Sequence, residues 1–231
     1  MTRMIKTVAN IICVAAVVSL GPASTTQPSN DFMDYLLRLI SNEAEQYKLE
    51  AVRAADFNIS VNSNWFTNRV FKAKFQNGFV RGLSRVSRKD NCQPTRWTHG
   101  NITLACELDL SRVIVTYVVA AKGHTLNPRT DWMDVYVKVE TGTALFETQS
   151  LPNKPPHIKT FIIKPPLVLS VERVARKSRI DLNEGRSADF NRQVIREVKR
   201  VVQDAVMSTY LSILSRVMTK YSDVLILPPV V

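Results

Sequence analysis

The fold is decided by residues 187–221, SADFNRQVIREVKRVVQDAVMSTYLSILSRVMTKY, which contain neither proline nor glycine. Such a stretch predicts one long helix, and at ~1.5 Å of rise per residue it would span roughly 50 Å. Ser187 is the expected N-cap, and Asp189 would place a negative charge in the first turn, where it suits the exposed N–H groups.

The apolar side chains of this helix change sides midway. On a wheel of ~100° per residue, the stripe of the second half lies roughly 140° from the stripe of the first half. The first stripe is Phe190, Val194, Ile195, Val198, Val201, Val202, Ala205 and Val206, and the second is Met207, Tyr210, Leu211, Ile213, Leu214, Val217, Met218 and Tyr221. Either the helix breaks near Ser208 and Thr209, or a strongly twisted β-sheet winds around it. The second alternative is favoured, because residues 205–211 are all tolerated in a helix.

The N-terminus has the layout of a secretory signal peptide over residues 1–23. Arg3 and Lys6 give a basic start, residues 8–20 are apolar, and small residues follow. An uncleaved membrane anchor is the alternative, but the apolar run is shorter than the ~20 residues that a spanning helix needs. We therefore predict a secreted, extracellular protein. Residues 24–231 contain no linker or repeat and are predicted to form a single domain.

Two features fit a secreted chain. Removal of the signal peptide takes Cys13 away and leaves Cys92 and Cys106, which we predict to form a disulfide, two separate buried thiols being the alternative. The sequons that begin at Asn58 and Asn101 are predicted glycosylation sites.

The net charge of +11 falls to +9 when Arg3 and Lys6 are removed, and it favours anionic partners. The basic residues form two clusters, Arg81/Arg85/Arg88/Lys89 and Arg173/Arg176/Lys177/Arg179. Either cluster could bind phosphates of lipid headgroups, or it could simply be a solvated strand face. A nucleic-acid partner is not expected, because no aromatic residues are interleaved with these arginines.

The middle of the chain alternates with a period of two and predicts an antiparallel meander. A first helix is expected over residues 30–52, and the proline pairs Pro155-Pro156 and Pro165-Pro166 indicate edges or loops. Asn77-Gly78 and Gly142 are read as hairpin turns. The expected strands are residues 56–65, 70–76, 79–88, 102–110, 113–122, 133–141, 144–148, 158–164 and 167–174. Helix, strands and long helix in this order predict the α+β class.

The sequence offers no pattern for catalysis. It has no GxSxG, GxGxxG, P-loop or HExxH motif, and His99, His124 and His157 are scattered. We therefore predict a protein that is not an enzyme and that uses no cofactor or metal. The abundant apolar residues are consistent either with a filled core or with a lined cavity, and periodicity does not separate the two.

Three segments carry a resemblance to a known family: FVRGLSRV (79–86), LDLSRVIVTYVVAAK (108–122) and the valine-rich segment 134–146. Over residues 30–220 the chain resembles the group 7 mite allergens. These are similar to the bactericidal/permeability-increasing, juvenile-hormone-binding and takeout proteins. The resemblance implies a strongly twisted antiparallel sheet rolled around a long C-terminal helix, with a second N-terminal helix and an apolar lipid-binding tunnel.

The resulting hypothesis is a secreted carrier that holds a lipid or another small apolar ligand between sheet and helices. The alternative is a cationic host-defence or surface-recognition protein that binds an anionic membrane or lipopolysaccharide. The expected ligand-lining residues are Val115, Tyr117, Trp132, Val194, Val198, Val201, Val202 and Ala205.

Overall fold

The computed structural model describes residues 26–62, 70–123, 129–177, 180 and 182–230. The predicted signal peptide, His124 and Arg179 lie outside these ranges. The helices are α1 (Gln27–Asn42), η1 (Leu83–Arg85), α2 (Glu184–Asp204), the π-helical η2 (Ala205–Tyr210) and α3 (Leu211–Lys220). The strands are β1 (Val52–Ala54), β2 (Phe57–Val61), β3 (Phe71–Arg81), β4 (Ser87–Arg88), β5 (Arg96–Thr98), β6 (Asn101–Asp109), β7 (Ile114–Lys122), β8 (Asp131–Ser150) and β9 (His157–Ala175).

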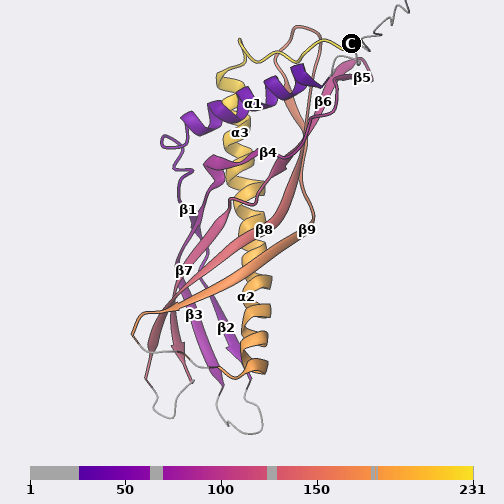
Figure 1. Cartoon of the computed structure of the whole chain (residues 1–231). Helices are drawn as coiled ribbons and strands as arrows, with labels where there is room; N and C mark the ends of the chain where they lie inside the picture. The colour runs from indigo at the N-terminus through magenta and orange to yellow at the C-terminus, as the bar shows by residue number, and fades with distance from the viewer. Residues whose placement is uncertain (1–25, 63–69, 124–128, 178–179, 181, 231) are drawn as a thin grey trace, which may run out of the picture.

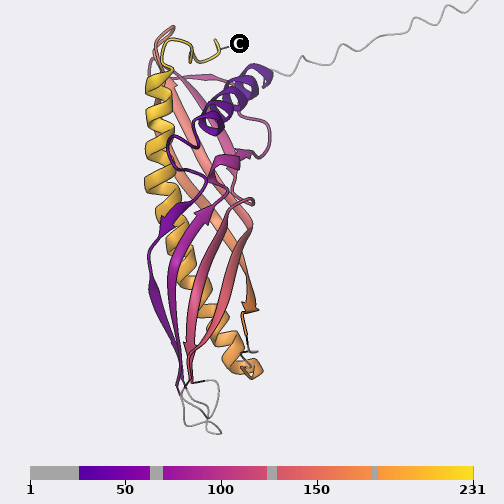
Figure 2. The same cartoon turned by 90° about the vertical axis from the view of Figure 1, so that its left-hand side faces the viewer.

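All nine strands of the described residues form one antiparallel, strongly twisted sheet, with the long helix against it (Figures 1 and 2). The predicted α+β class is confirmed. Strand β8 pairs with β9 along nearly its whole length. On its other side, the first half of β8 pairs with β7 and the second half with β6. The sheet therefore has a lower half with β2, β3 and β7 and an upper half with β5 and β6 (Figure 1).

Two predicted hairpins are wrong, because the chain continues through both as a bulged strand. At Asn77-Gly78 the register of β3 against β7 shifts, and Asn77 takes a left-handed φ of 53°. A Cβ on Gly78 would lie 2.2 Å from Cε1 of the Tyr117 ring, so glycine is needed here to make room for an aromatic neighbour. Gly142 likewise lies inside β8, at a second register shift.

The second proline pair lies inside β9 rather than in a loop. The Pro165–Pro166 peptide bond is cis. It lies opposite the irregular part of β8, between the register partners Thr141–Val168 and Thr143–Lys164. Among the described strands β9 pairs only with β8, so it is an edge strand, as the prolines indicate.

The first helix is shorter than predicted. It ends at Asn42, and turns carry the chain from there to β1, with Lys48 at a φ of 54°. The carboxylate of Glu43, at the end of α1, accepts hydrogen bonds from Lys220 and, at 2.7 Å, from the Tyr221 hydroxyl. These contacts tie the end of α1 to the end of α3.

This tie is expected to depend on pH. The hydrogen bonds from Lys220 and Tyr221 hold the pKa of Glu43 below its ordinary value of 4.5. Ionised Glu43 therefore stabilises the folded protein at neutral pH, and the contribution is lost as the pH falls through the lowered pKa. The protection factors for amide hydrogen exchange at the ends of α1 and α3 should therefore fall as the pH drops through this lowered pKa. In Glu43→Gln they should already be lower at neutral pH; unchanged exchange in that variant would contradict the tie.

The long helix is continuous, and it begins three residues before the predicted N-cap. The side chain of Asn183 caps it by accepting from the Arg186 N–H at 3.0 Å. Ser187 lies inside the first turns, where its hydroxyl accepts from Arg173 of β9. Figure 1 shows one rod from α2 to α3 without a break.

A π-helical turn lies where the apolar stripe of the long helix changes sides. Neither of the two alternatives drawn from the sequence included such a turn. Residues 205–210 form the π-helix η2, at the position where the apolar stripe moves. A π-turn accommodates about one extra residue, which corresponds to about 100° on an α-helical wheel. It therefore absorbs most of the apparent shift of roughly 140°, and the twist of the sheet needs to account only for the rest.

Candidate functional site

The inner face of the sheet and the long helix meet in an apolar interface, which we call the seam. Seven of the eight predicted lining residues lie on it: Val115, Tyr117, Val194, Val198, Val202 and Ala205 are buried, and Val201 is half-buried. Helix α2 contacts the two edge strands of the lower half, β2 and β9, and η2 contacts β1 and β9. The helix therefore spans from one edge of the sheet to the other.

The lower part of the seam is filled by aromatic rings. The Phe190 ring of α2 lies 5.8 Å from Phe71 and 6.0 Å from Phe75, measured between ring centroids. Phe75 in turn stacks on Phe57 at 4.3 Å and meets the edge of Tyr117 at 5.6 Å. Contacts of this kind fix the helix against the sheet at its lower end.

The upper part of the seam is lined by smaller side chains and contains one tyrosine. Val202, Ala205 and Val206 are buried there. Tyr210, the last residue of the π-turn, is only 1% exposed, and its ring lies 6.1 Å from that of Phe161 on β9. The Tyr210 hydroxyl is buried and has no hydrogen-bond partner among the residues that the structure describes.

Tyr117 provides the contrast. It is also buried, but its hydroxyl donates to the backbone carbonyl of Ala55 at 2.7 Å. Burial raises the pKa of both tyrosine hydroxyls well above the ordinary value. Both therefore stay protonated over the physiological range, and Tyr210 offers an O–H donor in apolar surroundings.

A buried polar group without a partner costs about 1–3 kcal/mol, and in native proteins it usually has a reason. The Tyr210 donor lies on a π-turn, a type of helix irregularity that occurs frequently at functional sites. The arrangement can hold an apolar molecule that presents one oxygen acceptor. A charged group would be disfavoured there, because its desolvation is costly.

Trp132 does not belong to the seam. It lies on the outer face of β8 and is 41% exposed. It borders two open hollows, of about 610 and 430 Å³, on the outer face of the lower half. A third hollow, of about 350 Å³, lies beside α1, where Arg38, Arg85 and Arg112 gather.

Three residues of the basic clusters are paired with carboxylates within the protein. Arg88 forms two hydrogen bonds to Asp34, of 2.9 and 3.0 Å, and Arg176 binds both oxygens of Asp134. Lys89 lies 3.8 Å from Glu107. The paired carboxylates raise the pKa of Arg88 and of Arg176. These three side chains are therefore less available to an anionic surface than the sequence suggests.

The Cys92–Cys106 disulfide is present, and it joins β6 to the segment before β5. The backbone N–H of Cys92 donates to Asn30 of α1 at 2.8 Å, so the disulfide region also holds the first helix. Asn58 is exposed on β2, and Asn101 is the half-buried first residue of β6. Their glycosylation stays a prediction.

Within the described ranges, no three His, Cys, Asp or Glu side chains gather as a metal site. His99 lies in the turn between β5 and β6, and His157 begins β9. No helix of the same ranges is long and apolar enough to cross a membrane.

No protein-family model and no curated protein matches the chain. Among solved structures, the crystal structure of Takeout 1 from Epiphyas postvittana is similar to it, at 13% sequence identity and a TM-score of 0.42. The similarity covers 85% of this chain and 91% of that one. Takeout proteins are among the groups that the sequence resemblance includes, whereas the narrower likeness to group 7 mite allergens stays a prediction.

Sequence reasoning missed two groups of residues. Tyr210 was placed in the apolar stripe, but its unpaired hydroxyl could not be seen from the sequence. The second group is Lys72, Lys74 and Lys122, which line the outer-face hollow of about 430 Å³. The alternation of Phe71, Lys72, Ala73, Lys74 and Phe75 does indicate that two of these lysines share one face.

Proposed function

We propose that this protein is a secreted, non-enzymatic carrier that binds a lipid or another small apolar molecule in the upper part of the seam. The observation that carries the proposal is the buried Tyr210 hydroxyl, which has no partner among the described residues. The ligand is a neutral molecule with an apolar body and one oxygen acceptor, such as an ester, an alcohol or a protonated fatty acid. Its oxygen accepts the Tyr210 hydrogen bond.

Burial of the ligand's apolar surface provides most of the binding free energy. Removing 300 Å² from water would contribute about 7 kcal/mol before the costs of association. Val202, Ala205 and Val206 supply the apolar wall from the helix, and Phe161 of β9 lies beside the Tyr210 ring. These side chains are packed in the structure, so the ligand enters by separating the upper helix from β9.

Polar contacts hold the helix at both edges of the sheet while the upper seam opens. Gln193 donates to the Ser60 carbonyl of β2 at 2.9 Å, and Arg173 of β9 donates to Ser187 at 2.8 Å. Both contacts lie at the lower end, next to the aromatic rings. The lower seam therefore acts as the fixed end of the rod. The predicted leader, the sequons and the disulfide support action outside the cell.

Replacing Tyr210 by Phe tests this function through two readouts of opposite sign. Binding of a neutral fluorescent probe, the methyl ester of cis-parinaric acid, should weaken about two- to tenfold, the value of one hydrogen bond. The ligand-free variant should unfold a few degrees higher than the wild type, because a buried unpaired hydroxyl has been removed. Fluorescence titration and thermal unfolding measure the two effects.

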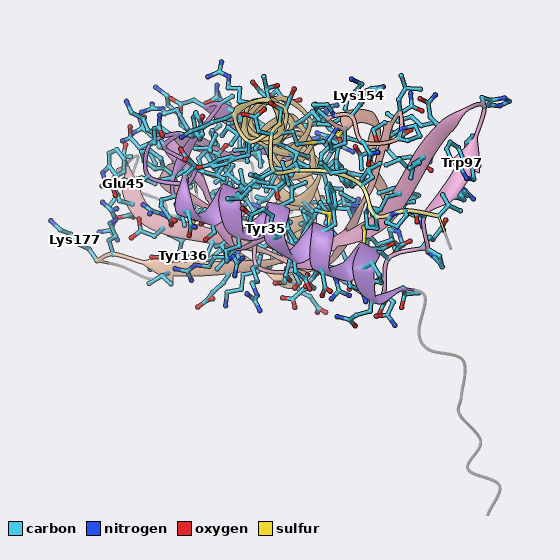
Figure 3. All side chains as sticks on the ribbon, turned by 90° about the horizontal axis from the view of Figure 1, so that it is seen from above. Tyr35, Glu45, Trp97, Tyr136, Lys154 and Lys177 are labelled. Carbon is cyan, nitrogen blue, oxygen red and sulfur yellow. A yellow bond between two sulfur atoms is a disulfide. The ribbon has the colours of Figure 1, made fainter. Side chains whose placement is uncertain are left out.

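Tyr136→Phe is the matched control, since Tyr136 is an exposed tyrosine on the outer face of β8 (Figure 3). It should change neither readout. The proposed function fails if the wild type ignores the probe and native mass spectrometry of the secreted protein shows no copurifying lipid. Equal probe affinity in Tyr210→Phe and the wild type would rule out the assigned hydrogen bond.

A further inference from the structure

The outer face of the lower half carries a hollow that the seam does not explain. We call it the outer groove and define it by Lys72, Lys74, Gln76, Ala120, Lys122 and Trp132. Its volume is about 430 Å³. The residues come from β3, β7 and β8, three neighbouring strands in the order of the sheet. They point to the side opposite the seam, since the alternate residues Phe71, Ala73 and Phe75 are buried inside.

Three ammonium groups meet at this groove without anionic partners. Lys72 and Lys122 are direct cross-strand partners, and Lys74 is the partner of Ala120. All three lysines are exposed, and none forms an ion pair with a residue in the ranges that the structure describes. The acidic side chain that lines the adjacent hollow, Asp131, is paired with Arg129 at 2.9 Å.

The Lys72–Lys122 pair is unfavourable unless an anion lies beside it. Directly opposite side chains on antiparallel strands have Cβ atoms only about 5 Å apart, and like charges at such positions destabilise the sheet. A bound phosphate or carboxylate between them would convert the repulsion into two favourable contacts. The three lysines therefore favour a ligand with a negatively charged group.

The other residues that line the groove favour a ligand whose body is apolar. Ala120 is half-buried, and its small side chain leaves the space between Lys74 and Trp132, which are its partners on the two neighbouring strands. Trp132 is 41% exposed and lines the groove on the β8 side. Indole rings favour both alkyl chains and flat rings as neighbours.

We propose that the outer groove is a second binding site, which takes one anionic amphiphile: a phosphate or carboxylate head among the three lysines and an alkyl or aromatic body against Trp132 and Ala120. The site is independent of the seam, because it lies on the other face of the sheet and selects an anion rather than a neutral ligand. The volume matches pockets for single small molecules, which favours one bound amphiphile over a flat membrane contact.

Calorimetric titration with decyl phosphate, kept below its micelle concentration, tests the site. The wild type should bind decyl phosphate and should bind the neutral decanol much more weakly. The double variant Lys72→Gln/Lys122→Gln should lose about tenfold in affinity, as expected for two exposed charge pairs. Added salt should weaken wild-type binding further, because these charges are screened.

The ligand-free double variant should be at least as stable as the wild type, since the like-charge pair has been removed. Thermal unfolding measures this and shows at the same time that the variant folds. Trp132→Ala should also weaken decyl phosphate binding several-fold. The matched controls are Trp97→Ala in β5 and Lys154→Gln in the turn between β8 and β9. Both side chains are exposed, and both lie far from Lys177, which lines the hollow adjacent to the groove (Figure 3).

Four results would overturn the proposal: no binding of decyl phosphate, equal binding by all variants, loss only in Tyr210→Phe, or binding only to vesicles that contain phosphatidylserine. The third result would place the anion in the seam, and the fourth would assign the lysines to a membrane surface. Because Asn58 also borders the groove, the titration is repeated after enzymatic removal of N-glycans, and the same order of variants is expected.

Discussion

Replacing Phe190 by alanine is expected to lower the free energy of unfolding by about 3–5 kcal/mol. Phe190 is fully buried, and its ring packs between Phe71 and Phe75 of β3. The Arg173 guanidinium of β9 lies 5.5 Å from the centroid of the same ring. One side chain thus joins the long helix to β3 and to the edge strand β9, so its removal leaves a cavity where all three meet.

Urea unfolding followed by circular dichroism measures this loss. Met207→Ala is the matched control: Met207 lies in the same rod but is 36% exposed, and its replacement should cost less than about 1 kcal/mol. Similar losses in the two variants would mean that the lower seam does not anchor the helix. The fixed end that the proposed opening requires would then be missing.

Removing the disulfide by the double replacement Cys92→Ala/Cys106→Ala should cost about 3 kcal/mol. The sequence separation is 14 residues, and closing a loop of this length restricts the unfolded chain by about that amount. The effect should extend to α1, because Asn30 accepts from the Cys92 N–H and donates to Asn91.

Urea unfolding with and without reductant measures the contribution of the disulfide. Reduced wild type and the double variant should agree, and reductant should not affect the variant. A loss below about 1 kcal/mol would show that packing of β5, β6 and α1 fixes this region without the disulfide. Hydrogen exchange in α1 should rise in the double variant and stay unchanged in Met207→Ala.

Strand positions with strict alternation could be predicted from the sequence alone. Val135, Val137 and Val139 are buried while Tyr136, Lys138 and Glu140 are exposed, as the period of two requires. The run with apolar residues on both faces lies in β7, between β3 and β8, as expected for a central strand. In these segments the local pattern and the tertiary environment agree.

The hairpins were mispredicted because a distant residue decides the local conformation. Asn77-Gly78 has typical turn chemistry, but the glycine is required by the ring of Tyr117 on the neighbouring strand, 39 positions later in the chain. The strand can therefore continue past it as a bulge. Such a requirement is visible only when the register of β3 against β7 is known.

The side of Trp132 could have been found from the sequence. It has the same parity as Asp134 and Tyr136, which the sequence already places on the wet face of their strand. Trp132 was predicted to line the seam because it is apolar, and its position in the alternation of the strand was not used. The π-turn could not have been found in this way, because residues 205–210 have no composition that separates a π-turn from an α-helix.

The most direct test of the seam is a single NMR measurement on protein with ¹³C-labelled valine and alanine methyl groups, bound to the methyl ester of cis-parinaric acid. We expect intermolecular NOEs from the probe to the methyl groups of Val202, Ala205 and Val206, beside the Tyr210 ring. NOEs to Val118 and Ala120 of the outer face instead, with none to the three helix residues, would contradict this expectation.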